Sequence, residues 1–232
     1  MLKKLAKTDP HYQGILKKIE SKNSISHGSA IMALSMLQAY TQDDSFLQKE
    51  ENLQWAGKCS HWNKFSSIAS LGLIFKNHKN KDVLKKFLPG NTNADVSNHY
   101  PNGGSLYGLG LLFTATSNQE IIDYIIEVTT NPAHNQNEVI MHGACLGLGL
   151  TAFASANETI GERLKDILNS STSIMGEASA LAIGLTFAGT NNELILSDLI
   201  ALAQETEHEK TLRSICLSIG LISFGHPSLV FL

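Results

Sequence analysis

The residue types that carry chemistry in proteins are present in this 232-residue chain, but their spacing forms no recognised site. The nine histidines are spread out, and the acidic pairs Asp43-Asp44 and Glu50-Glu51 adjoin no pocket that the sequence indicates. The patterns G-x-x-x-x-G-K-[ST], H-E-x-x-H and G-x-S-x-G, which bind phosphate, bind zinc or present a nucleophilic serine, do not occur. We therefore nominate no catalytic, cofactor-binding or metal-binding residue, and we expect no cofactor.

Individual histidines and cysteines have ordinary structural interpretations. His27 and His142 stand just before segments rich in small residues, where packed or capping side chains are expected, and His208 lies in a charged connection where a solvated loop is expected rather than a metal site. The three cysteines show no C-x-x-C spacing, and Cys145 and Cys216 share one apolar position of a repeat. We expect all three cysteines to be small core residues in a reducing compartment.

One weak nucleotide-binding pattern occurs at residues 147–152, where Gly-Leu-Gly-Leu-Thr-Ala fits G-x-G-x-x-A. That pattern binds a dinucleotide only where it joins a strand to a helix. Here the segment recurs along the chain, and Phe113 replaces its last small residue in the preceding copy. A nucleotide-dependent α/β enzyme is therefore disfavoured, and measured strand content would reveal one.

The recurring segment is the dominant feature of the chain. A glycine between two large aliphatic residues occurs five times, at spacings of 38, 39, 35 and 36 residues, and a weaker copy centred on Ser35 lies 37 residues earlier. The residues six and two positions before that centre are small in every copy, and the residue four before it is apolar. The structural repeat positions that we assign are Ser35, Gly72, Gly104, Gly108, Gly110, Gly143, Gly147, Gly149, Ala178, Ala182, Gly184, Ser214, Ser218 and Gly220. Small residues four apart lie on one helix face and let another backbone approach closely.

Each unit is predicted to be a helix, a short turn and a second, amphipathic helix. Leu146 to Leu150 alternates as a strand would, but the other copies do not, and they are rich in Ala, Leu and Met. Second helices are predicted at 118–128, 159–168 and 193–203, and the segment from Pro89 to Pro101 is predicted to be a connection. The apolar residues expected to point inward include Tyr124 and Ile126 in the first of these helices and Leu164, Ile167 and Leu168 in the second. Because glycine costs about 1 kcal/mol relative to alanine within a helix, the first helices should be buried and the second helices outer and more charged.

Composition and charge exclude several classes. With 43% hydrophobic and 17% charged residues the chain is too apolar to be disordered. Residues 140–156 are too short and too polar to be favoured as a membrane span, and residues 2–10 have no apolar core of a signal peptide. Residues 1–90 contain 14 Lys and Arg against 7 Asp and Glu, whereas residues 91–232 contain 4 against 14. The basic cluster of Lys76, Lys79, Lys81, Lys85 and Lys86 lacks interleaved aromatic or arginine residues, so we expect a solvated face and no nucleic acid.

The recurring small-residue helix resembles the proteasome/cyclosome repeat of large non-ATPase proteasome subunits and of the largest anaphase-promoting complex subunit. Residues 51–72, 120–124 and 203–213 are similar to the family of 26S proteasome non-ATPase regulatory subunit 1, and the resemblance runs from about residue 24 to 225. It implies an all-α, armadillo-like solenoid of helical hairpins, with inner and outer layers in an open arc of a toroid. Residues 1–23 would be a helical lead-in, and residues 24–232 would hold about five repeats and a truncated sixth.

The resemblance further implies a non-catalytic scaffold of the regulatory particle base, in cytoplasm and nucleus, that supports ubiquitin-dependent protein degradation. Its partners would be lid and ATPase subunits, with ubiquitin-like or ubiquitin-receptor proteins as further candidates, and with no nucleic acid and no membrane. The family's long rod, remaining repeats and C-terminal domain are missing, so we expect a partial chain whose uncapped ends make it self-associate. The alternative is a stand-alone helical solenoid that binds peptides or proteins outside the proteasome.

Overall fold

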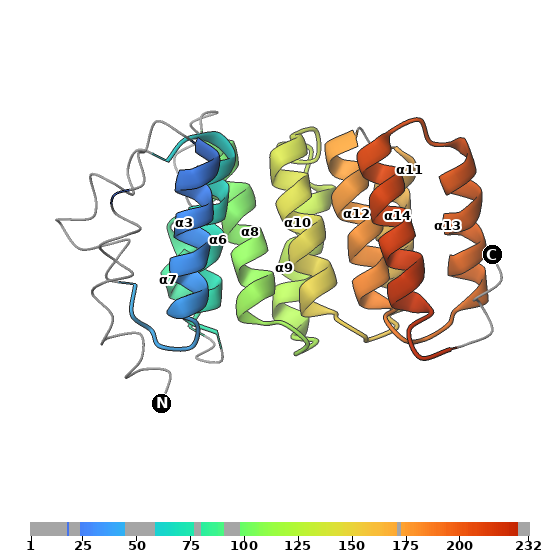
Figure 1. The fold of residues 1–232 in the computed structure, drawn as a ribbon, viewed down its shortest axis with the longest axis horizontal. Helices are drawn as coiled ribbons and strands as arrows, with labels where there is room; N and C mark the ends of the chain where they lie inside the picture. Colours follow the sequence, from blue (N-terminus) through green and yellow to red (C-terminus); the bar gives the residue numbers. More distant parts are fainter. Residues whose placement is uncertain are drawn as a thin grey trace. The chain divides into compact units, whose positions relative to one another are not determined.

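The computed structural model describes residue 18 and residues 24–44, 59–76, 80–90, 98–170 and 173–226. Every regular element within these ranges is a helix, as Figure 1 shows. The prediction of an all-helical repeat protein is confirmed, and the segment that alternates like a strand lies inside a helix. The predicted lead-in over residues 1–23, apart from residue 18, lies outside the described residues, as do Glu50-Glu51, Lys79 and residues 227–232.

The six small-residue segments form six helices of 14 residues each, which we call the first helices. They are α3 (Ser24–Leu37), α6 (His61–Ile74), α8 (His99–Leu112), α10 (Glu138–Thr151), α12 (Ser173–Thr186) and α14 (Glu209–Ile222). Two expectations on their limits were wrong. His27 and His142 lie within α3 and α10 rather than before them, and the connection that was expected to reach Pro101 already ends where α8 begins. Proline is tolerated in the first turn because its missing N–H would have no partner there.

The other helices, which we call the second helices, follow the predicted amphipathic stretches. They are α7 (Asp82–Lys85), α9 (Gln119–Thr130), α11 (Glu158–Asn169) and α13 (Glu193–Glu205). On α11 the predicted inward residues Leu164, Ile167 and Leu168 are buried. On α9, Tyr124 and Ile126 are only half-buried although both were expected to point inward.

Asparagine side chains begin several of these helices. At the starts of α9, α11 and α13, the side chains of Asn118, Asn157 and Asn192 each accept a hydrogen bond from the backbone N–H of the residue three positions later, at 3.1, 3.1 and 3.2 Å. Asn137 does the same at α10. An acidic residue lies in the first turn of each, where it stabilises the positive end of the helix dipole.

The chain forms two compact units, residues 1–112 and 113–232. In the first unit α6 packs against both α3 and α8, and the short α7 contacts α6 and α8. In the second unit α12 packs against both α10 and α14, while α9, α11 and α13 each pack against the first helix that follows it. Thus the packing of a second helix against the first helix that follows it occurs three times in the second unit. The predicted arc depends on how the two units are placed, and it stays a prediction.

Candidate functional site

The close contacts between first helices involve the small repeat residues. In the first unit, a Cβ atom added to Gly72 of α6 would overlap the backbone of Gly108 in α8, and one added to Gly104 would overlap the backbone of Phe65. A backbone cannot rotate away as a side chain can. Any larger residue at these two positions would therefore force the helices apart.

The second unit repeats this contact in the same register. A Cβ atom on Gly149 would lie 2.7 Å from the Cα of Ala182, and one on Gly184 would lie 2.6 Å from the Cα of Ser218. In each case the central glycine of one copy meets the small residue two positions before the centre of the next copy. Ser218 adds a hydrogen bond across the interface, because its Oγ donates to the backbone oxygen of Ala180 at 2.8 Å.

All the assigned repeat positions are buried except one. Ser35 is buried and its Oγ donates to the backbone oxygen of Ile31 at 2.7 Å, four residues earlier. Gly220 is the exception: it is exposed, and a Cβ atom there would meet no atom of the described residues within 4 Å. Its helix, α14, has no further first helix beside it in the described part of the chain.

Backbone hydrogen bonds also link consecutive copies, a feature that the sequence reasoning missed. The turn after one first helix donates N–H groups to the last carbonyls of the next first helix. The bonds in the second unit are Ala115 to Leu150, Ser117 to Thr151, Ala154 to Leu185, Ala156 to Thr186, Gly189 to Leu221 and Asn191 to Ile222, at 2.9–3.0 Å. All six donor residues have positive φ, and only Gly189 and Asn191 are of residue types that favour this conformation, so the sequence carries little signal.

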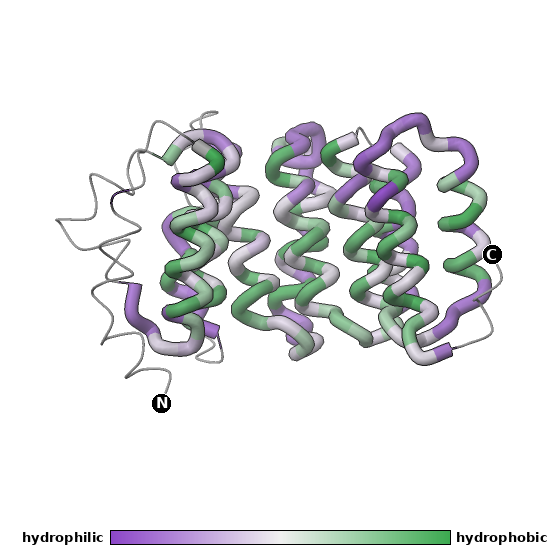
Figure 2. Tube along the Cα trace, in the orientation of Figure 1, coloured by the Kyte–Doolittle hydropathy of each residue, from purple (hydrophilic) through white to green (hydrophobic). Residues whose placement is uncertain are grey.

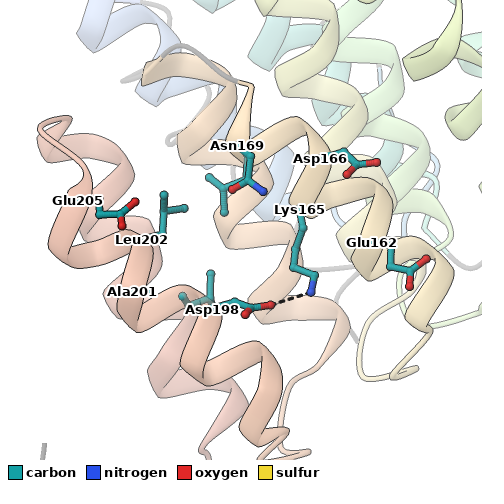
Figure 3. A pocket seen from close by; sticks show the side chains of 10 residues that line it. Glu162, Lys165, Asp166, Asn169, Asp198, Ala201, Leu202 and Glu205 are labelled. Atoms are coloured by element: carbon teal, nitrogen blue, oxygen red, sulfur yellow. Dashed lines mark hydrogen bonds and ion pairs between the residues drawn. The ribbon is translucent and has the colours of Figure 1, made fainter.

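A polar groove of about 490 Å³ lies between the second helices α11 and α13 (Figure 3). Glu162, Asp166, Asp198 and Glu205 give its lining an acidic character. Lys165 of α11 crosses the groove to Asp198 of α13, with 2.8 Å between Nζ and the carboxylate oxygen. Such a groove can hold a polar or basic segment of another chain, but nothing in it resembles a reaction centre.

Buried cysteines and histidines are packing residues. Burial raises the pKa of the Cys145 thiol to about 12, so this side chain stays an uncharged core residue at neutral pH. Burial also lowers the pKa of His142, whose Nδ1 lies 3.0 Å from the backbone oxygen of Ile174. His27 lies buried with its Nδ1 3.8 Å from the Cys59 sulfur. The expectation that Cys216 is a core residue is wrong, because that side chain is exposed on α14.

Other sites considered from the sequence receive no support from the described residues. No group of three His, Cys, Asp or Glu side chains among them could hold a metal ion. None of the helices seen in the described ranges is long and apolar enough to span a membrane. Lys81, Lys85 and Lys86 are exposed around α7, as expected for a solvated face, and Lys86 lies over the ring of Phe87.

Hydropathy distinguishes the helices α12 and α14 from the connection that precedes α14 (Figure 2). Figure 2 shows much of α12 and α14 as hydrophobic, while the segment that joins α13 to α14 is hydrophilic. His208 in this segment is exposed and precedes the first residue of α14, as expected of a solvated connection. These features define a helical repeat protein whose recurring geometry is a packing surface between repeats rather than a pocket for chemistry.

Comparison with known proteins identifies the class of repeat and then individual relatives. A proteasome/cyclosome repeat is recognised at residues 178–212. The chain is 38% identical over 213 residues to 26S proteasome regulatory subunit RPN2 of Candida glabrata, and this match covers 89% of the chain and 22% of that protein. It is 36% identical over 213 residues to 26S proteasome non-ATPase regulatory subunit 1 homolog A of Arabidopsis thaliana, a match that covers 91% of the chain and 20% of that protein.

A third relative, 26S proteasome non-ATPase regulatory subunit 1 of Drosophila melanogaster, is 35% identical over 204 residues, covering 87% of the chain and 19% of that protein. Over about 90% of its length the chain is therefore similar to proteins named 26S proteasome regulatory subunit RPN2 or 26S proteasome non-ATPase regulatory subunit 1. It spans about a fifth of the length of the relatives that it matches.

Proposed function

We propose that this chain is a non-catalytic scaffold segment of the proteasome regulatory particle base, and that it holds neighbouring subunits in place for ubiquitin-dependent protein degradation. The observation that carries the proposal is the close contact of first helices that recurs within each unit, made by residues that have no chemical function of their own. Similarity to regulatory subunits over about 90% of the chain supports the assignment to this assembly.

The partners we propose are ATPase and lid subunits of the same particle, with ubiquitin-like or ubiquitin-receptor proteins as further candidates, in cytoplasm and nucleus. The acidic groove between α11 and α13 is one surface that such a partner could contact. Exposed charged side chains on second helices supply specificity more readily than affinity, because water screens them.

Affinity purification of the tagged chain from cell extract tests this proposal. We expect proteasomal ATPase and lid subunits to be recovered in fixed proportion to the chain. The matched control is Gly149→Leu, which should disrupt the packing of α10 against α12. Proteasomal subunits should then no longer be recovered with the tagged chain. Recovery of no proteasomal subunit above the level of an untagged extract would contradict the proposal.

A second candidate function is a stand-alone solenoid that binds peptides, and the groove of Figure 3 is the observation that favours it. In that case a basic peptide should bind the purified chain in the absence of any proteasomal subunit. Asp198→Lys, which reverses one charge of the groove lining, should weaken such binding. If the peptide binds the wild-type chain and this variant equally well, the groove is not the binding site.

A further inference from the structure

Consecutive second helices of the second unit are bridged in two different ways. Between α9 and α11, Arg163 of α11 reaches the end of α9. Its Nε donates to the Thr129 hydroxyl at 3.1 Å, and its Nη2 donates to the Thr129 backbone oxygen at 2.6 Å. Thr129 is fully buried, so water has little access to these bonds. A single arginine side chain therefore bridges this pair of helices.

The next pair of second helices, α11 and α13, lacks that arginine. Counted from the asparagine that caps each helix, Arg163 of α11 and Asp198 of α13 are both the sixth residue. Thr129 of α9 and Leu168 of α11 are likewise both the eleventh. Aspartate is much shorter than arginine and has the opposite charge, and leucine has no hydroxyl group. The groove of about 490 Å³ between α11 and α13 lies at this place, since Asp198 and Leu168 both line it.

The charges that line the groove are unbalanced. The four carboxylates of Glu162, Asp166, Asp198 and Glu205 share it with one cation, Lys165. The ion pair of Lys165 with Asp198 is half exposed to water, which weakens it. Within the described ranges no other salt bridge involves a carboxylate of the groove. A second cation, supplied from outside, would therefore be attracted to the groove.

Apolar side chains also line the groove, and this favours arginine over lysine as the cation. Leu168 and Leu199 are buried and Leu202 is half-buried in the lining. Figure 3 shows Leu202 and Glu205 on the α13 side and Asn169 on the α11 side. A guanidinium group is less strongly hydrated than an ammonium group and pairs with a carboxylate through two parallel hydrogen bonds. The carbon chain that carries it can pack against leucine side chains.

We propose that the groove between α11 and α13 binds an arginine side chain of a partner subunit, as Arg163 bridges α9 and α11 within this chain. The occupant is a segment of the partner that carries this arginine beside an apolar residue, and the arginine competes with Lys165 for Asp198. The inference rests on the proposed scaffold function, because it names the chemistry that would hold one neighbouring subunit. Since α11 packs against α12 and α13 packs against α14, both walls of the groove are supported from within the chain.

Fluorescence anisotropy of a labelled peptide tests the site on the purified full chain. The peptide carries two arginines one helical turn apart, which matches the spacing of Glu162 and Asp166 on α11. A second peptide with lysines keeps the charge, and a third with citrullines keeps the shape without the charge. We expect the arginine peptide to bind at least about tenfold more tightly than the citrulline peptide, and more tightly than the lysine peptide. If arginine gives no advantage over either replacement, the proposal is wrong.

A double substitution copies the bridge between α9 and α11 into the groove. Asp198→Arg supplies the arginine, and Lys165→Ile supplies the residue at the same position of α9, Ile126. The added arginine should occupy the groove and weaken binding of the arginine peptide at least about tenfold. Glu127→Gln, an exposed position of α9, is the matched control, because it changes the net charge equally but lies outside the groove. The single variant Glu205→Gln, also exposed, should weaken binding without disturbing the fold. Unchanged binding by the double variant or by Glu205→Gln overturns the proposal.

Affinity purification of the same tagged variants from cell extract separates this inference from the proposed function. We expect the double variant to lose at least one proteasomal subunit that the wild type and Glu127→Gln both recover. If the double variant recovers every subunit that the wild type does, the groove is not a partner site, although the scaffold function stands. If the wild type recovers no proteasomal subunit but still binds the arginine peptide in the groove, the proposed function fails and the arginine site stands.

Discussion

The helices α11 and α12 pack against each other, yet their sequences specify them in different ways. On α11, Ile160 and Leu164 are buried while Glu162 and Asp166 are exposed, which is the ordinary pattern of an amphipathic helix. On α12 most positions are buried or half-buried, and what distinguishes its faces is side-chain volume. The comparison shows that one layer is specified by polarity and the other by the absence of bulk.

The two kinds of helix therefore differ in what stabilises them. Burial of a leucine or isoleucine side chain contributes about 1.5–3 kcal/mol, so α11 is stabilised by a few large residues. The glycines of the first helices cost about 1 kcal/mol each relative to alanine, and close packing of backbone against backbone offsets this. A first helix without its neighbours is therefore marginal.

The largest expected effect is on the glycine contacts. Gly72→Leu places a side chain where the backbone of Gly108 lies, so we expect the first unit to lose more than about 3 kcal/mol of its free energy of unfolding. Urea denaturation monitored by circular dichroism measures this. The matched control is Gly220→Ala, at an equivalent but exposed position, which should be neutral or stabilising. Equal destabilisation by both substitutions would show that close approach does not explain the repeat.

A large but ordinary effect is expected in the second layer. Leu164 is fully buried on α11, and Leu164→Ala should destabilise the second unit by about 2–5 kcal/mol because it leaves a cavity. The same urea experiment applies. Leu164→Met should cost much less, since this layer requires apolar volume and not one shape. If both substitutions cost the same, the second layer is as demanding in shape as the first.

A smaller effect is expected at the helix starts. The Asn157 side chain accepts a hydrogen bond of 3.1 Å from the N–H of Ile160, and Asn157→Ala should cost about 1 kcal/mol. Asn157→Asp keeps the acceptor and should be close to neutral. A loss of similar size in both variants would point to a role other than capping.

The smallest effect is expected at the ion pair across the groove. Lys165 and Asp198 have side chains that are 33% and 54% exposed, so the pair should contribute less than about 1 kcal/mol and less still at high salt. A double-mutant cycle of Lys165→Met and Asp198→Asn at two salt concentrations measures the coupling. Coupling that is larger than this and insensitive to salt would mean that the groove is drier than the structure indicates.

The elements of this protein could be predicted from its sequence because their signals are local. The amphipathic patterns gave α9, α11 and α13 within two residues at each end, and the spacing of small residues gave the six first helices. The four-residue α7 in the first unit was not predicted as a helix of that length, because Lys81, Lys85 and Lys86 give a charged segment with little pattern. The turns with positive φ at Ala115 and Ala154 were also missed, since alanine gives no signal for that conformation.

By itself the sequence determined the class of fold, the register of the repeat and the absence of known catalytic patterns, because these follow from residue type and spacing along one chain. Only the tertiary structure decided which repeat helices are covered by a neighbouring repeat helix. Cys145 and Cys216 share a repeat position, yet one is buried and the other exposed, because exposure depends on whether another helix lies alongside. Local sequence can specify a surface that fits a neighbour, but whether that neighbour is in place is settled in three dimensions.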